Sequence, residues 1–122
     1  MQPGRSLVFI YNADSEMLPK ANDFMSRPTG GLTEPCNLIA LTFSPIGMKK
    51  EWKRFINSLK IEVRFLSRDE FTSEFKNIAV TFPAAFLSTG KDLFVMATTD
   101  EINRCRDLED LIGLIRQRLP QA

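Results

Sequence analysis

Residues 82–97 read FPAAFLSTGKDLFVMA and predict a β-hairpin. Two short runs of strand-forming residues, 84–88 and 93–97, flank the tetrapeptide TGKD, whose Gly and Asp are typical of a tight turn. A tight turn joins antiparallel strands, because parallel strands need a long crossover connection. We therefore expect these two runs to form the antiparallel end of a sheet.

Three further strands are predicted upstream of the hairpin. Residues 7–11 form a continuous apolar run that suits a strand covered on both faces, residues 37–43 (NLIALTF) form a second apolar run, and residues 61–66 alternate in polarity. Each of these runs precedes a stretch with helical character, and right-handed crossovers would make the three strands parallel.

Four helices are predicted. The clearest spans residues 48–59, where apolar side chains recur at helical spacing: Met48, Trp52, Phe55, Ile56 and Leu59. Ser67 and Glu70 match a capping box for a short helix through residue 75, and Asp107 can cap a last helix that ends before residue 120. A first, short helix would follow Asp14, with Pro19 in its first turn.

The predicted order is β-α-β-α-β-α-β-β-α, which places the chain in the α/β class with a mixed sheet. A length of 122 residues is typical of one domain, so we expect a single domain over residues 1–122. A hydrophobic fraction of 43%, with ten Phe, supplies the side chains for a core.

This order resembles thioredoxin over essentially the whole chain, which implies a thioredoxin-like three-layer α/β/α fold. Thioredoxin-like proteins carry a cis-proline directly before the strand that begins the terminal hairpin, and Phe82-Pro83 stands at that place. The resemblance therefore implies a cis Phe82–Pro83 bond. It also places the redox CxxC motif at residues 44–47 (SPIG), which contain no cysteine, so a dithiol mechanism lacks both sulfur atoms.

Three segments are also similar to an uncharacterised family of small bacterial proteins: NADS (residues 12–15), PCNLIALTF (35–43) and GMKKEWKRF (47–55). Members of that family often have a second cysteine at the place of Ile39, giving PCNLC. The family carries no activity that can be transferred to this chain.

The turn formed by Ser44, Pro45, Ile46 and Gly47, together with Pro83, is the first candidate binding surface. The turn is predicted at the carboxyl end of a parallel strand, where open α/β sheets bind ligands, and it opens a helix whose free N–H groups suit an anion. We expect a protein or a small ligand there, with no cofactor and no metal. The alternative is that Pro45 and Gly47 only make the turn.

Asn12 and Asp14 are further candidate site residues. They follow the first predicted strand and should lie at the same edge of the sheet as Ser44. Asp14 could act as an acid, a base or a metal ligand, and its simpler role is to cap the next helix.

Cys36 and Cys105 are the possible reactive thiols. Cys36 precedes the second predicted strand, so we expect it at the opposite end of the sheet from residues 44–47, as a packing residue. Cys105 lies between Arg104 and Arg106, which would lower its pKa if it is exposed. A divergent thiol-dependent redox protein is therefore the alternative to a non-enzymatic binding module.

The composition excludes several classes of function. The chain has no histidine, which removes Ser-His-Asp and Cys-His catalysis and every imidazole metal site. The net charge is only +1, and the basic cluster of residues 49–60 lacks exposed aromatic residues for base stacking, so we expect no nucleic-acid partner. No apolar run is long enough to span a membrane, and the two cysteines are isolated, which favours a cytoplasmic protein without a membrane partner.

Overall fold

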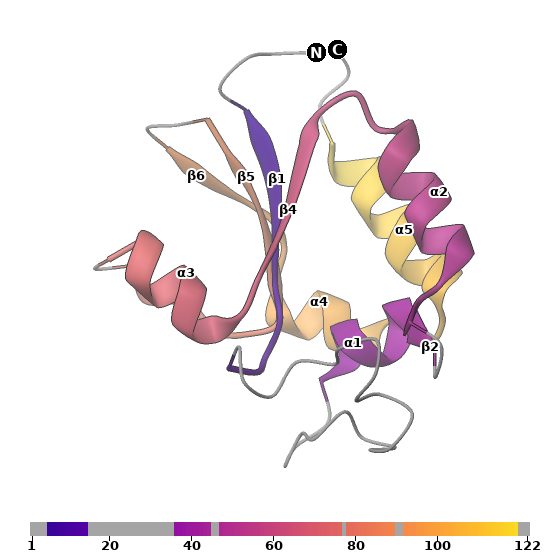
Figure 1. The fold of residues 1–122 in the computed structure, drawn as a ribbon, viewed down its shortest axis with the longest axis horizontal. Coiled ribbons are helices and arrows are strands. Elements are labelled where there is room, and N and C mark those ends of the chain that lie inside the picture. The colour runs from indigo at the N-terminus through magenta and orange to yellow at the C-terminus, as the bar shows by residue number, and fades with distance from the viewer. Residues whose placement is uncertain (1–4, 15–35, 45–46, 77, 90–91, 120–122) are drawn as a thin grey trace.

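The computed structural model describes residues 5–14, 36–44, 47–76, 78–89 and 92–119. This part of the chain contains a four-stranded mixed sheet with the strand order β4-β1-β5-β6 (Figure 1). Strand β1 (Ser6–Ile10) is parallel to β4 (Glu62–Leu66) and antiparallel to β5 (Ala84–Ser88), which pairs with β6 (Leu93–Ala97) in an antiparallel hairpin. The predicted α/β class, mixed sheet and terminal hairpin are confirmed.

The prediction of a second strand at residues 37–43 is wrong. Its residues form helix α1 (Asn37–Thr42), which is followed by a small antiparallel ribbon of β2 (Phe43–Ser44) and β3 (Gly47–Met48) outside the main sheet. The buried side chains Leu38, Leu41 and Thr42 are spaced as on one helix face. A short apolar run does not distinguish a buried helix from a buried strand, so the described sheet has one parallel pair instead of three parallel strands.

The other helices agree with the prediction except for one addition. The expected helices are α2 (Lys50–Ser58), α3 (Arg68–Glu74) and α5 (Leu108–Arg118), with Asp107 as the N-cap of α5. Helix α4 (Thr99–Arg104) was not predicted. The predicted helix after Asp14 lies outside the described residues. None of the helices in the described ranges is long and apolar enough to cross a membrane.

Capping boxes start two of these helices. Ser67 accepts a hydrogen bond from the backbone N–H of Glu70, whose carboxylate accepts one from the backbone N–H of Ser67. Thr98 and Glu101 form the same reciprocal pair at the start of α4. Each box satisfies two N–H groups that have no partner inside the helix, which fixes where the helix begins.

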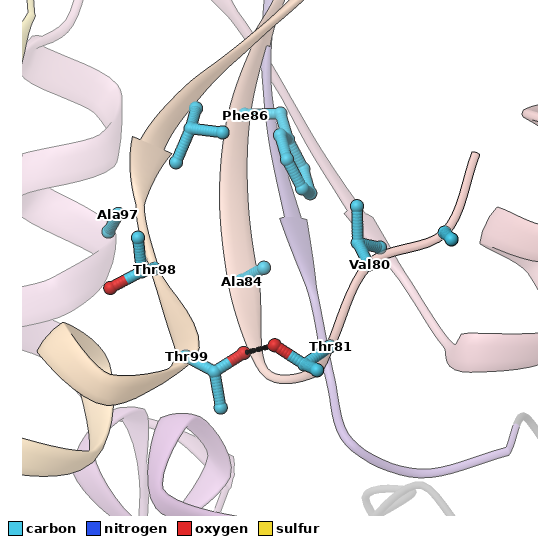
Figure 2. A pocket seen from close by; sticks show the side chains of 9 residues that line it. Val80, Thr81, Ala84, Phe86, Ala97, Thr98 and Thr99 are labelled. Atoms are coloured by element: carbon cyan, nitrogen blue, oxygen red, sulfur yellow. Dashed lines mark hydrogen bonds between the residues drawn. The ribbon is translucent and has the colours of Figure 1, made fainter.

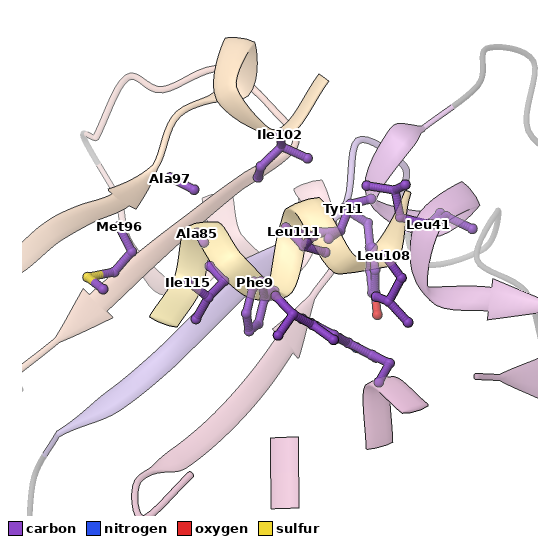
Figure 3. Close-up of a cluster of buried hydrophobic side chains, with 14 of the residues drawn as sticks. Phe9, Tyr11, Leu41, Ala85, Met96, Ala97, Ile102, Leu108, Leu111 and Ile115 are labelled. Carbon is purple, nitrogen blue, oxygen red and sulfur yellow. The ribbon is translucent and has the colours of Figure 1, made fainter. Parts of the chain in front are cut away.

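Helices cover both faces of the sheet, with α2 and α5 on one face and α3 on the other (Figure 1). The larger core joins β1 to α2 and α5 and includes Phe9, Trp52 and Ile115, and Figure 3 shows part of it around α5. The smaller core lies under α3, where the ring of Phe71 stacks on that of Phe86 at 5.7 Å between centroids. All five residues of β1 are buried, as expected for a strand covered on both faces.

The Phe82–Pro83 peptide bond is cis, as the resemblance implied. Pro83 is buried and directly precedes β5, whose first residue, Ala84, pairs with Ile10 at the carboxyl end of β1.

Candidate functional site

At the carboxyl end of the parallel pair β1 and β4, the side chains of Asn12 and Asp14 contact Arg68. Because Ile10 and Leu66 are register partners, the segments that follow β1 and β4 leave the sheet side by side. The side chain of Arg68 donates to Asp14 Oδ1 and to Asn12 Oδ1, each at 3.3 Å, and its backbone N–H donates to the carbonyl of Ala13 at 2.8 Å. Asp14 is thus held in a half-exposed ion pair, which is worth at most about 1 kcal/mol.

Cys36 also lies at the carboxyl end of β1, so the prediction that it lies at the opposite end of the sheet is wrong. The backbone N–H of Asn12 donates to Cys36 Sγ at 3.3 Å. The reason is that Cys36 is the N-cap of α1 and does not lead into a strand. The thiol is only 2% exposed. Burial, and secondarily the proximity of Cys36, raises the pKa of the Tyr11 hydroxyl well above its usual value.

Ser44 and Gly47 lie in the ribbon of β2 and β3, where Ser44 Oγ donates to the carbonyl of Gly47 at 3.0 Å. Gly47 has a φ of +120°, which only glycine adopts without strain. Pro45 and Ile46 lie outside the described residues. The premise that this turn ends a strand of a parallel sheet is wrong, because residues 37–42 are helical. The ring of Phe43 contacts that of Tyr11, which keeps the ribbon near the end of β1.

Cys105 follows α4, and its carbonyl accepts a hydrogen bond at 3.1 Å from the side chain of Asn37, the residue after Cys36; both thiols are free. Its Sγ donates to the carbonyl of Glu101 at 3.4 Å. Burial and the neighbouring carboxylates of Asp110, Asp107 and Glu101 raise the pKa of the Cys105 thiol, so the expectation that adjacent arginines lower it is wrong. The sequence neighbours of a residue do not determine which charges lie closest to its side chain in the fold.

A pocket on the α3 side of the hairpin was not foreseen from the sequence. It has a volume of about 490 Å³ and lies between the segment before β5 and the strand β6 (Figure 2). We call it the β6 groove, and its lining residues are Ala79, Val80, Thr81, Ala84, Phe86, Val95, Ala97, Thr98 and Thr99. None of these side chains is charged. The hydroxyls of Thr81 and Thr99 hydrogen-bond to each other at 2.5 Å, at one end of the groove.

The β6 groove lies beside Pro83 on one side and, on the other, beside β6, the last strand of the sheet within the described part of the chain. Ala84, which follows Pro83, contributes to the lining, so the groove lies at the end of the sheet that holds Asn12 and Asp14. Val95 belongs to the edge strand β6 and is 57% exposed. All nine lining residues fall within residues 79–99, in the segment before β5, in β5, in β6 and at the start of α4.

Within the ranges that the structure covers, no group of three or more Cys, Asp or Glu side chains is arranged to hold a metal ion. Comparison of the chain with protein-family models, with curated proteins and with solved structures finds no match.

Proposed function

We propose that this chain is a thioredoxin-like protein-binding module without redox chemistry, and that the β6 groove is its binding site. One observation carries the proposal: an uncharged groove of about 490 Å³ opens directly beside an edge strand whose central residue is more than half exposed. The proposal keeps the predicted location near Pro83 and moves the contact surface away from the turn at residues 44–47.

The sheet topology supports a thioredoxin-like assignment. A parallel pair, β1 and β4, continues into an antiparallel terminal hairpin, and the peptide bond before that hairpin is cis. Because Ile10 pairs with Ala84, the turn nearest to Pro83 is the one that begins at Asn12. By the same resemblance a redox motif would fall in residues 12–15 (NADS), which contain no cysteine. This placement again argues against dithiol chemistry.

The chemistry of the groove favours an extended, uncharged protein segment. An edge strand presents unpaired backbone N–H and C=O groups, so a peptide can add to it as a further strand. In an extended peptide alternate side chains point the same way, so one of them would enter the groove between Val80 and Val95. A charged side chain would be desolvated there without a partner, which is costly. The hydroxyls of Thr98 and Thr99 suit a small polar group.

A peptide titration tests the proposal. The probe is a short peptide of alternating Val and Thr with blocked ends, followed by amide NMR. We expect shifts in Val80, Val95 and Thr98, and little change in Ser44 and Gly47. Shifts centred on the ribbon of β2 and β3, or no shift at millimolar peptide, would overturn the assignment of the groove.

Two matched variants sharpen this test. Val95→Asp introduces a charge into the groove and should weaken peptide binding at least about tenfold, because the carboxylate must be desolvated. Ile78→Asp is the control: Ile78 is also an exposed aliphatic residue, at 41%, but it does not line the groove. Equal losses in both variants would show that peptide binding is nonspecific.

A single-thiol redox role for Cys36 is the second candidate, because Sγ lies 3.3 Å from the N–H of Asn12, at the start of the turn nearest to Pro83. Burial of the side chain to 2% exposure counts against access by a disulfide substrate. Titration of the folded protein with a chromogenic disulfide separates the two functions: we expect no fast-reacting thiol, and rapid reaction of Cys36 would support the redox role.

A further inference from the structure

We propose that the segment that adds to β6 is the β6 strand of a second copy of this chain, so that two domains join through a continuous eight-stranded sheet. This inference rests on the proposed function, because it names the partner of the same edge strand. It rests on three features of β6: its unprotected edge, its self-complementary sequence and its two exposed apolar side chains.

The two edges of the sheet differ in how they are protected. Natural edge strands carry charges, prolines or inward-pointing polar groups that prevent pairing with another chain. The β4 edge has Glu62 and Arg64, and Arg64 pairs with Glu74 at 2.7 Å. The β6 edge reads LFVMA and contains neither a charge nor a proline. Among the strands that the structure describes, the β6 edge is therefore the one open to strand addition.

The β6 strand is compatible with itself in the antiparallel direction. A two-fold axis at Phe94 would place Phe94 opposite its copy and Leu93 opposite Val95 of the other chain, with no like charges facing each other. The same operation on β4, about Arg64, would place two guanidinium groups opposite each other, which is unfavourable. The irregularity in the pairing of β6 with β5 falls between Val95 and Ala97, so residues 93–95 remain regular.

Exposed apolar surface on both faces of β6 gives the pairing its driving force. Phe94 is 53% exposed and Val95 is 57% exposed, and they point to opposite faces of the sheet. A symmetric partner strand would cover both. Val95 lines the β6 groove beside Phe86, so Leu93 of the second copy would lie at the mouth of the groove. On this face of β6 the groove thus has space for a side chain of the second copy.

The size of the contact predicts a weak dimer. Five residues a side form a small interface, below the roughly 1,200 Å² at which specific complexes become stable. We expect a monomer–dimer equilibrium with a dissociation constant on the order of 10–500 µM, which corresponds to a weak, transient complex.

Sedimentation equilibrium of the full chain, from about 5 µM to about 1 mM, tests the inference. We expect the weight-average mass to rise towards that of two chains with increasing concentration. Phe94→Lys should weaken dimerisation at least about tenfold, because a charge at the centre would face its own copy. Asn103→Lys adds the same charge to an exposed position on α4 and should leave the equilibrium unchanged. Amide NMR spectra establish that both variants are folded.

A chain that stays monomeric at 1 mM, or a dimer that Phe94→Lys leaves intact, would overturn the inference. The peptide titration separates this failure from failure of the proposed function. If the chain is monomeric and the Val-Thr peptide still shifts Val95 and Thr98, the groove binds another protein segment and only the dimer is wrong. If neither the peptide nor a second copy binds, both the dimer and the groove assignment are wrong.

Discussion

Replacing Phe55 by Ala tests the packing of α2 against the sheet. The side chain of Phe55 is 5% exposed, its ring centroid lies 5.7 Å from that of Trp52, and the guanidinium of Arg116 lies 5.3 Å from its ring centroid. Truncation removes the transfer free energy of the buried ring and leaves a cavity that the close-packed neighbours fill only in part. We therefore expect the free energy of unfolding to fall by about 3–5 kcal/mol. Loss of the Arg116 contact adds to the upper end of this range.

Urea unfolding, followed by the fluorescence of the single Trp, measures this change. For a chain of 122 residues the corresponding fall in melting temperature is roughly 12–20 °C. Lys53→Ala is the control, because Lys53 is exposed on the same helix and its truncation should change stability by no more than about 0.5 kcal/mol. Equal losses in the two variants, or a loss below about 1 kcal/mol for Phe55→Ala, would mean that the buried face of α2 is assigned wrongly.

Three further changes test the local structure. Hydrogen bonds from Arg118 and Thr98 lower the pKa of Glu101. The ionised carboxylate therefore stabilises the fold above its unfolded pKa, and this contribution is lost as the pH falls through the lower folded pKa. The stability advantage of the wild type over Glu101→Gln, measured by urea midpoints, should be constant near neutral pH and vanish in acid. Gly47→Ala should cost about 1 kcal/mol or more in thermal unfolding because its φ is +120°, although the added methyl meets no neighbour, and an unchanged melting temperature would contradict this backbone conformation. Ser67→Ala should cost about 0.5–2 kcal/mol through loss of the capping box, and a neutral result in the same melt would argue against that cap.

Elements with one unambiguous signal were predictable from the sequence. The hairpin has a turn at the right spacing between two apolar runs, and α2 has a stripe that includes Trp52 and Phe55. The start of α3 follows from Ser67 and Glu70, whose side chains form the expected reciprocal hydrogen bonds. Each of these signals is local and is compatible with one type of secondary structure, so tertiary packing did not have to select between a helix and a strand.

The remaining elements depend on packing that is not local. Residues 37–42 are apolar enough for a strand or a helix, and only their burial against α4 and α5 selects the helix. Helix α4 follows β6 directly, so its capping box, Thr98 with Glu101, was hidden behind the apolar run of the strand. A capping-box search at the end of every predicted strand would have found it.

The candidate site was predictable only in part. Asn12 and Asp14 were expected at the carboxyl end of the first strand, and they lie there. Their partner Arg68 is 54 residues beyond Asp14 and meets it only because β1 and β4 are parallel neighbours. The β6 groove was not anticipated, because its lining within residues 79–99 includes the start of α4, a helix that was not predicted from the sequence.

The central position of β1 also constrains the order of events during synthesis. Its partners in the described part of the chain follow about 55 positions later in β4 and about 75 or more later in β5, so its apolar residues wait for these strands while the intervening chain is being made. At translation rates of about 5–20 residues per second, this interval lasts several seconds. During that time residues 6–10 (SLVFI) are an uncharged, strand-forming segment of the kind that self-associates when exposed. Pulse-labelled nascent chains that extend through β4 but stop short of β5 should therefore be more sensitive to protease than chains that include β5 and β6.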